Sequence, residues 1–330
     1  MANLKQALPA AWQRQAPWLA LLLPFSGLYA LVTGWQRWCY RVGLKQAYRA
    51  PVPVMVIGNI TVGGSGKTPL IIHLVQHLQQ HYNLKVGVIS RGYGGQGMFP
   101  KLVTDLSTPD QVGDEPVLIV QQTQVPMAVA PNRQAAIECL LRAHPIDLIL
   151  SDDGLQHLAL ARDIEWIVLD ANRGLGSGWL LPAGSLRESA QRLHTATVIE
   201  HGAASTAALN MQLQPLALQP LNPMQQYDQI APQRGQTVHA VAGIGHPQRF
   251  FQQLRDLDFI VIEHAFADHH VYRTADVDFA DGLPMLTTSK DAVKLFGLGV
   301  QGWILPVEAV LSEACYVVLE QQLQALALIG

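Results

Sequence analysis

The chain has 330 residues, which is enough for two α/β domains or for one large domain. Its net charge is −3 and only 14% of its residues are charged, which argues against a nucleic-acid partner, because such proteins present a basic patch. The three cysteines, Cys39, Cys139 and Cys315, lie far apart in the sequence. This spacing indicates neither a disulfide framework nor a metal site and is typical of a reducing compartment.

The N-terminal segment is uncharged from Arg14 to Arg37 and almost continuously apolar over residues 18–32. It is slightly shorter than the ~20 residues of a spanning helix, and Pro24 and Gly27 interrupt it. Tryptophans flank it, as they do at membrane interfaces: Trp12, Trp18, Trp35 and Trp38. Basic residues follow, which would hold that side in the cytoplasm: Arg37, Arg41, Lys45 and Arg49. We predict a membrane-associated helix, spanning or interfacial; the alternative is a buried core helix.

A glycine-rich loop, GNITVGGSGKTP at residues 58–69, follows an apolar strand at 54–57 and precedes a predicted helix. The usual phosphate-loop pattern would place its first glycine at Thr61, but residues 63–68 match it. Glycines let successive backbone N–H groups point inward at a helix N-terminus, which forms an anion site. The alternative is a flexible glycine turn. We therefore predict that ATP is bound by Thr61, Val62, Gly63, Gly64, Ser65, Gly66 and Lys67, and that Thr68 ligates Mg²⁺.

Acidic residues follow a second apolar strand, residues 147–150. Asp152 and Asp153 at the end of this strand would place carboxylates beside the Mg²⁺ of a bound nucleotide, although Asp-Gly is also a common turn. Gln156 and His157 would face the same cleft if the loop curls back. Asp114, in Gly-Asp-Glu-Pro, is in a turn-like segment, but loops at the carboxyl ends of parallel strands converge on a ligand. Asp114 could therefore accept the proton of an acceptor hydroxyl.

Several blocks in order make the chain resemble the tetraacyldisaccharide 4'-kinases of lipid A biosynthesis. They are GNITVGGSGKTP, SRGYGG, GDEP, SDDGLQH, LLPAGSLRE, AGIGHPQRFF, FADHH and TTSKDAVK. The resemblance implies a bacterial inner-membrane enzyme with its catalytic part on the cytoplasmic face. It would move the γ-phosphate of ATP, with Mg²⁺, to the 4'-hydroxyl of a lipid A disaccharide 1-phosphate, giving the bisphosphorylated precursor lipid IVA.

The resemblance also implies roles for individual residues. Asp114 would be the base for the acceptor, His269 its partner, and Arg187 a stabiliser of phosphate charge. Apart from the resemblance, we predict that Glu115, Gln156 and His157 contact substrate. Ser185 stands where the family pattern leads us to expect proline, so this chain departs from the family at that loop.

Two other sites are not predicted. Asp268, His269 and His270 are adjacent, so their side chains diverge, and no second ligand cluster is spaced for zinc. Lys290 and Asp291 are also adjacent, so a Lys-x-Asp pattern for guanine is absent. We expect them to line the nucleotide side or to cap the following helix.

The predicted fold is α/β: a P-loop NTPase-like, mostly parallel sheet with a smaller second α/β domain and an N-terminal membrane-associated helix. Residues 1–50 form the membrane segment, 51–202 the kinase core, 203–237 a junction and 238–330 the smaller domain. The active site would lie between the domains, so Asp114 and His269 would meet as the domains close. The alternative function is a membrane-attached nucleotide switch or ATPase that controls a protein partner, using Gln156 and the loop at 91–95.

Overall fold

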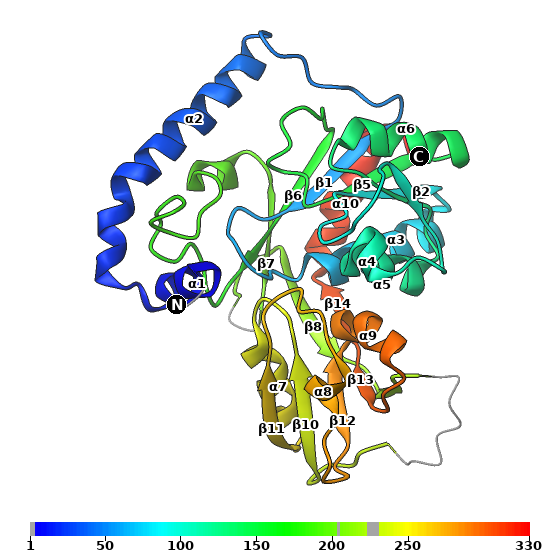
Figure 1. Ribbon diagram of the computed structural model, residues 1–330. Coiled ribbons are helices and arrows are strands. Elements are labelled where there is room, and N and C mark those ends of the chain that lie inside the picture. Colours follow the sequence, from blue (N-terminus) through cyan, green and yellow to red (C-terminus); the bar gives the residue numbers. More distant parts are fainter. Residues whose placement is uncertain (1–3, 203–204, 223–230) are drawn as a thin grey trace.

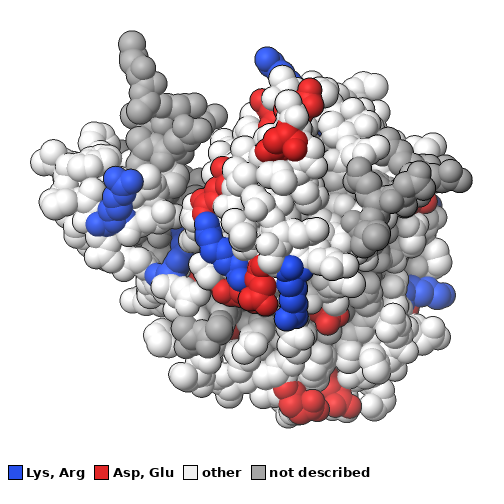
Figure 2. Space-filling model, turned by 90° about the horizontal axis from the view of Figure 1, so that it is seen from below, with Lys and Arg blue, Asp and Glu red and all other residues white. Residues whose placement is uncertain are grey.

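The structure is a computed structural model that describes residues 4–202, 205–222 and 231–330. Residues 203–204 and 223–230 of the predicted junction lie outside the described residues. Figure 1 shows a larger sheet above a smaller one, with a long N-terminal helix along one flank of the larger sheet. Figure 2 views the smaller-sheet end, where acidic and basic side chains alternate on a mostly uncharged surface and no broad basic area is visible.

The larger sheet has the strand order β14-β8-β7-β6-β1-β5-β2-β4-β3. Its strands are β1 (Val54–Gly58), β2 (Val86–Ser90), β3 (Lys101–Val103), β4 (Met127–Val129), β5 (Leu148–Asp152), β6 (Ile164–Asp170), β7 (Thr197–His201), β8 (Asn210–Pro215) and β14 (Val307–Leu311). The strands from β8 to β4 pair in parallel. Among the described strands of this sheet, only the edge strands β14 and β3 pair antiparallel with their neighbours. The predicted mostly parallel sheet is therefore confirmed.

Helices cover both faces of this sheet, so its strands are apolar on both sides. Met55 and Ile57 of β1 face the core beneath α3 (Lys67–Tyr82), α5 (Asp114–Thr123) and α10 (Glu313–Ala325). Val54 and Val56 face the opposite core, beneath α6 (Arg133–Ala143). Each of these four side chains is buried, and such burial stabilises a fold by ~1.5–3 kcal/mol per side chain. β1 therefore holds the start of the glycine-rich loop rigidly.

The smaller sheet has the order β11-β10-β12-β13-β9. Its strands are β9 (Gln219–Pro220), β10 (Thr237–Ala242), β11 (Ile260–Ala265), β12 (Met285–Thr288) and β13 (Trp303–Leu305). α7 (Pro247–Asp256) packs on one face through Phe250, Phe251 and Leu254. α9 (Ser289–Leu295), which continues into η3 (Phe296–Leu298), packs on the other face with Tyr272. Short helices α4 (Pro109–Val112), α8 (Thr274–Val277) and η2 (Ala190–His194) lie in connecting segments.

The last residues of the chain do not belong to the smaller sheet, although the predicted smaller domain was placed at residues 238–330. β14 pairs with β8 in the larger sheet, and α10 packs its Leu319 and Leu323 into the core of that sheet. The smaller sheet therefore ends at β13, and residues 307–325 return to the larger one. The reason is a pairing between strands that are distant in sequence, which the local pattern at the C-terminus does not reveal.

The N-terminal segment forms α1 (Leu4–Arg14), η1 (Pro17–Leu22) and α2 (Leu23–Arg41). Pro24 lies in the first turn of α2, where proline is tolerated, so it does not interrupt the helix. Within the described residues, Pro17–Arg41 is the one stretch long and apolar enough to cross a membrane, and only 11% of its most apolar window is buried. The alternative of a buried core helix is therefore wrong.

Candidate active site

The glycine-rich loop joins β1 to α3 at the carboxyl end of β1. Gly63 and Gly66 have positive φ angles of 108° and 85°, which glycine adopts without the steric cost of a side chain. Gly66 is the N-cap residue of α3 and has no side chain to bond the free N–H groups of the first turn. A helix start without a side-chain cap, as found here among the described residues, can bind an anion through its first N–H groups.

Thr61 occupies the position where a phosphate loop usually begins with glycine. It is buried and forms an antiparallel bridge with Leu186. On either side, the Val62 N–H donates to the Ser185 carbonyl at 2.9 Å and the Arg187 N–H donates to the Ile60 carbonyl at 2.7 Å. The backbone at Thr61 is thus paired like a strand, where a β-branched residue is well suited. Ser185 keeps this pairing through its carbonyl group, so its departure from the family pattern does not open the loop.

Lys67, Arg187 and Asp153 are brought together beyond β5. Asp153 lies just past the end of β5 with a φ angle of +46°. The Arg187 Nη1 donates to both Asp153 carboxylate oxygens, at 2.9 and 3.1 Å, and the Lys67 Nζ lies 3.8 Å from Oδ1. Burial acts to raise the pKa of Asp153, but the charges of Lys67 and Arg187 outweigh it and hold that pKa below its usual value. Asp153 is therefore an anion that links the two cations.

Asp152, the last residue of β5, is buried and differs from its neighbour. Burial, and then the negative charge of Glu115, raise the pKa of Asp152 to about 7. Ser90 donates to its Oδ2 at 3.3 Å, whereas Oδ1 is buried with no hydrogen-bond partner in the described part of the chain. A buried carboxylate with a free oxygen is stabilised by a nearby cation.

These residues fit a magnesium ion. Mg²⁺ prefers oxygen ligands and is usually held by one or two carboxylates together with nucleotide phosphates, not by an all-protein cage. Asp152 supplies a free carboxylate oxygen, and Thr68 lies in the first turn of α3. Over residues 4–202, 205–222 and 231–330, no group of three His, Cys, Asp or Glu side chains could hold a metal alone.

Asp114 and His269 contact each other, although Asp114 lies in a connection of the larger sheet and His269 in a connection of the smaller sheet. Asp114 begins α5 and is buried, and the His269 Nδ1 lies 3.1 and 3.0 Å from its two carboxylate oxygens. Burial acts to raise the pKa of Asp114, but the hydrogen bond from His269 and the charge of Lys290 lower it. The same hydrogen bond raises the pKa of His269. The pair is formed in the structure as it stands, so the expectation that it awaits further domain closure is not borne out.

Two lysines of α9 lie beside this pair: Lys290, which was expected to line the nucleotide side or to cap the helix, and Lys294, for which the sequence predicted no role. The Lys290 Nζ contacts the carboxylates of Glu115 at 3.0 Å, Asp268 at 3.2 Å and Asp114 at 3.9 Å. The Lys294 Nζ lies 3.9 Å from Asp114. Lysines four residues apart share a helix face, which was the available signal, but such a face usually contacts solvent. Asp291 is buried and accepts bonds from the Gly243 N–H and the Thr288 and Tyr272 hydroxyls. It therefore fixes the start of α9.

The two sheets also meet at the phosphate loop. A Cβ atom added to Gly245 would lie 2.9 Å from the backbone nitrogen of Gly64, so the loop before α7 contacts the phosphate loop closely. Arg249 of α7 donates to Asp170 at the end of β6 at 2.7 Å. The close approach of Gly245 to Gly64 and the Arg249–Asp170 ion pair join the two sheets. The Asp114–His269 and Lys290–Glu115 contacts do the same, so the candidate site lies between the two sheets.

Gln156 and His157 have different environments. The Gln156 Nε2 donates to the Asn59 carbonyl at 3.2 Å and to Glu188 Oε1 at 2.6 Å. Gln156 therefore stabilises the loop that follows β1. His157 lines a cavity of about 500 Å³ together with Tyr48 and Asn132. Burial, and then the charge of Arg133, lower the pKa of His157. The structure thus separates these two neighbours, which the sequence placed in one cleft.

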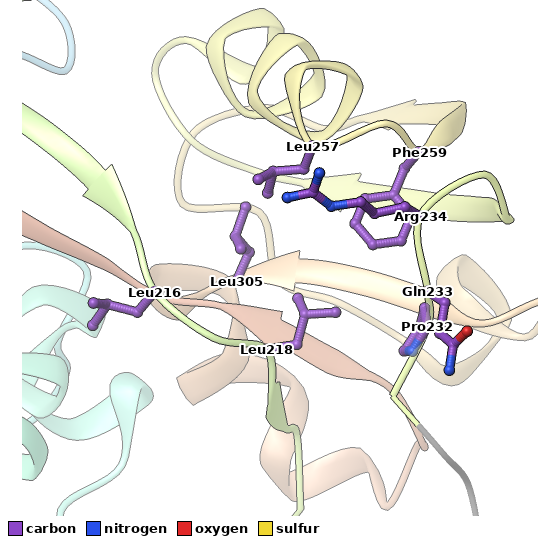
Figure 3. A pocket seen from close by; sticks show the side chains of 8 residues that line it. All are labelled: Leu216, Leu218, Pro232, Gln233, Arg234, Leu257, Phe259 and Leu305. Atoms are coloured by element: carbon purple, nitrogen blue, oxygen red, sulfur yellow. The ribbon is translucent and has the colours of Figure 1, made fainter.

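A second cavity, of about 350 Å³, lies where the chain crosses between the sheets (Figure 3). Leu216 and Leu218 line it on one crossing and Leu305 on the other, and Arg234 is the one charged side chain among the described residues that line it. None of the predicted site residues lines this apolar cavity. We therefore do not assign it to the nucleotide or its acceptor.

Comparisons with known proteins agree with the phosphate-binding geometry described above. A family model described as LpxK, Tetraacyldisaccharide-1-P 4'-kinase, matches residues 18–324. The tetraacyldisaccharide 4'-kinase of Psychrobacter cryohalolentis is 51% identical, over 98% of this chain and 97% of that protein. That of Pseudomonas fluorescens is 46% identical, over 96% of each. A crystal structure of LpxK from Aquifex aeolicus in complex with ATP superimposes with a TM-score of 0.75 at 25% identity, covering 93% of this chain and 99% of that one.

Proposed function

Because the chain belongs to the tetraacyldisaccharide-1-P 4'-kinase family, we propose which of its residues carry out the reaction of that family and where they do so. The chain is an ATP-dependent kinase that transfers the γ-phosphoryl group to the 4'-hydroxyl of tetraacyldisaccharide 1-phosphate. The products are ADP and the bisphosphorylated lipid A precursor. The observation that carries the residue assignment is the Asp114–His269 pair, which lies between the sheets on the same side as the phosphate loop.

Asp114 is the proposed base. A sugar hydroxyl loses its proton late, as its oxygen bonds to phosphorus and the bond from phosphorus to the ADP oxygen breaks, so a weakly basic carboxylate is sufficient. The lowered pKa of Asp114 keeps it ionised and ready to accept a hydrogen bond from the hydroxyl. The His269 ring bonds both carboxylate oxygens, which fixes the orientation of the base and stabilises its charge.

Lys67 and Arg187 are the proposed charge stabilisers. Catalysis of phosphoryl transfer depends mainly on positioning and on cations that face the charge developing on the phosphate oxygens. Lys67 begins α3, directly after the loop, and shares Asp153 with Arg187. Asp152, Asp153 and Thr68 would hold Mg²⁺, which supplies further neutralisation of phosphate charge when bound. The backbone of residues 61–66 would hold the phosphates, and Glu115 would hold Lys290 beside the acceptor.

The proposed location is the cytoplasmic face of the inner membrane, supported by the outer face of α2. Large apolar side chains are exposed there: Phe25, Leu28, Leu31, Val32, Trp35 and Trp38. An exposed apolar face of this size marks a membrane or partner surface. The opposite face of α2 bonds to the main body, as in Ser26 to the Leu180 carbonyl at 2.8 Å. These contacts favour a helix that lies in the interface over one that spans the bilayer.

The experiment that tests the function uses purified protein, labelled ATP and tetraacyldisaccharide 1-phosphate in mixed micelles. We expect a bisphosphorylated lipid, with little ATP hydrolysis when the lipid is omitted. Rapid lipid-independent hydrolysis without that product would contradict the proposal and favour a nucleotide switch. The structure offers little for a switch, since the amide nitrogen of Gln156 is already bonded to Asn59 and Glu188.

A further inference from the structure

The α2 helix has a second face, which is turned toward the protein. Partly or fully buried positions recur along it at helical spacing: Ser26, Tyr29, Thr33, Arg37 and Tyr40. Between them lie the exposed apolar residues of the outer face. In Figure 1 this helix runs along the flank of the larger sheet, beside the segment that connects β6 to β7. The inner face therefore meets the connection that carries Arg187.

Two polar contacts of the inner face reach the end of that connection. The Tyr29 hydroxyl donates to the Arg187 carbonyl at 2.8 Å. The Arg37 Nη2 donates to Glu188 Oε2 at 2.5 Å, and the Glu188 side chain is only 2% exposed. Glu188 also accepts bonds from Gln156 and Arg192, so Arg37 joins a buried polar network. A buried network of this kind holds its members in one arrangement when all are satisfied.

The same residues are paired to the phosphate loop on their other side. The Arg187 N–H donates to the Ile60 carbonyl, and the bridge between Thr61 and Leu186 extends this pairing. The Arg187 side chain then reaches Asp153 and, at 3.1 Å, the side-chain oxygen of Asn59. The backbone of Arg187 is thus held from one side by the phosphate loop and from the other by α2.

We propose that Tyr29 and Arg37 are positioning residues for phosphoryl transfer, whose contacts with the Arg187 carbonyl and with Glu188 set the place of Arg187. A guanidinium acts on developing phosphate charge only within a narrow range of positions, and a shift of about 1 Å is costly to the rate. The proposal rests on the role proposed above for Arg187. It makes Tyr29 and Arg37, but not the other residues of the inner face, supports of the ATP site, while the outer face serves the lipid surface.

The test compares Tyr29→Phe and Arg37→Gln with the wild-type enzyme. We expect kcat to fall roughly three- to tenfold in each, with KM for ATP and recovery on vesicles unchanged, because the placement of Arg187 is altered. The melting temperature should stay unchanged in Tyr29→Phe and fall in Arg37→Gln, where buried Glu188 loses one of its two arginine partners. Arg37→Lys should recover most of the kcat lost in Arg37→Gln. Ser26→Ala is the matched control, since Ser26 bonds Leu180 and Ala183 on the same connection but not Arg187 or Glu188. It should leave kcat unchanged.

A double-mutant cycle decides whether Tyr29 acts through Arg187. The Tyr29→Phe/Arg187→Gln enzyme should be no slower than Arg187→Gln alone, because the guanidinium to be positioned is already gone. If the two losses multiply, or if Ser26→Ala loses as much kcat as Tyr29→Phe, the inference is wrong while the kinase assignment stands. A normal kcat for Arg187→Gln would overturn both the inference and the proposed role of Arg187. Absence of phosphorylated lipid with the wild-type enzyme would instead overturn the proposed function.

Discussion

Thr61 illustrates how one residue can depart from a motif without losing its function. The usual glycine at this place gives backbone freedom, but here the backbone is extended and bridged to Leu186, so that freedom is not needed. The positive φ angles occur further along, at Gly63 and Gly66. Residues 63–68, which form the proposed anion-binding part of the motif, therefore keep the usual phosphate-loop pattern.

At the same scale, Lys67→Ala and Thr68→Ala should each reduce kcat by about two to three orders of magnitude, because one removes a cation facing the phosphates and the other a proposed magnesium ligand. Steady-state kinetics with lipid at saturation gives kcat, and far-UV circular dichroism with thermal melting serves as the folding control. Tyr82→Phe, a change at the far end of α3, provides a matched variant that should retain activity. Near-normal turnover in one of the alanine variants would exclude the residue replaced in it from the proposed site.

At the scale of elements, α3 has a histidine face opposite its catalytic end. His73, His77 and His81 follow one another at intervals of four residues, and the His77 ring lies 4.4 Å from His81 and 4.7 Å from Tyr316 of α10. His73 is bonded to the Tyr316 hydroxyl at 2.9 Å. Burial, and then the charges of His81 and His73, lower the pKa of His77 to about 4. The contact between α3 and α10 therefore requires a neutral His77.

This lowered pKa predicts a loss of stability in acid. An unfolded chain binds a proton at His77 near pH 6.5 while the folded chain does not, so the free energy of unfolding falls as pH decreases from about 6.5 to 4. After allowance for solvent screening at this partly exposed site, His77 contributes about 1–2 kcal/mol to that loss. Urea unfolding at pH 7 and pH 4.5 measures it. His77→Gln should reduce the difference, whereas replacing exposed His194 by glutamine should not. Equal pH dependence in all three proteins would exclude the histidine face of α3 as the cause.

The outer face of α2 is the second element with a testable role. Replacing Leu28, Leu31 and Trp35 by serine removes apolar surface that is exposed in the structure. Each buried apolar side chain contributes ~1.5–3 kcal/mol, so partition onto vesicles should fall at least tenfold. Sedimentation with vesicles measures partition, and kcat in mixed micelles should change little. Gln36→Ser, on the same helix, is the control. Complete pelleting of the triple variant would place membrane attachment elsewhere.

At the scale of the whole molecule, prediction from the sequence succeeded where structure is local. The order of β1, phosphate loop and α3 follows from apolar periodicity and turn residues over a short segment. The return of β14 to the larger sheet could not be predicted, because its partner β8 is far away in sequence. His269 and Asp114 were paired by resemblance alone, since no periodicity relates them. For Lys290 the sequence left two possibilities, the nucleotide side or a helix cap, because its carboxylate partner Glu115 lies far away in sequence.

Lys290 of α9, which packs on the smaller sheet, contacts Glu115 of α5, which packs on the larger sheet. Its loss should therefore affect both stability and kcat. Burial acts to lower its pKa, but the charges of Glu115, Asp114 and Asp268 raise it well above its usual value. Lys290→Met would leave these carboxylates facing one another, so we expect kcat to fall at least tenfold and the melting temperature to fall by several degrees. Lys290→Arg should restore part of both, and Lys85→Met, at an exposed lysine, should alter neither. An unchanged kcat in Lys290→Met would show that the acidic group tolerates the loss of its cation.

The central claim is that Asp114 and His269, contributed by different sheets, act as one unit on the acceptor hydroxyl. The most direct measurement is kcat for Asp114→Ala, His269→Ala and the double variant, with ATP and lipid saturating and folding verified by melting temperature. Because the imidazole acts by orienting and stabilising the carboxylate, the double variant should be little slower than the slower single variant. If the two losses instead multiply, the residues act independently, and the paired site between the two sheets would be contradicted.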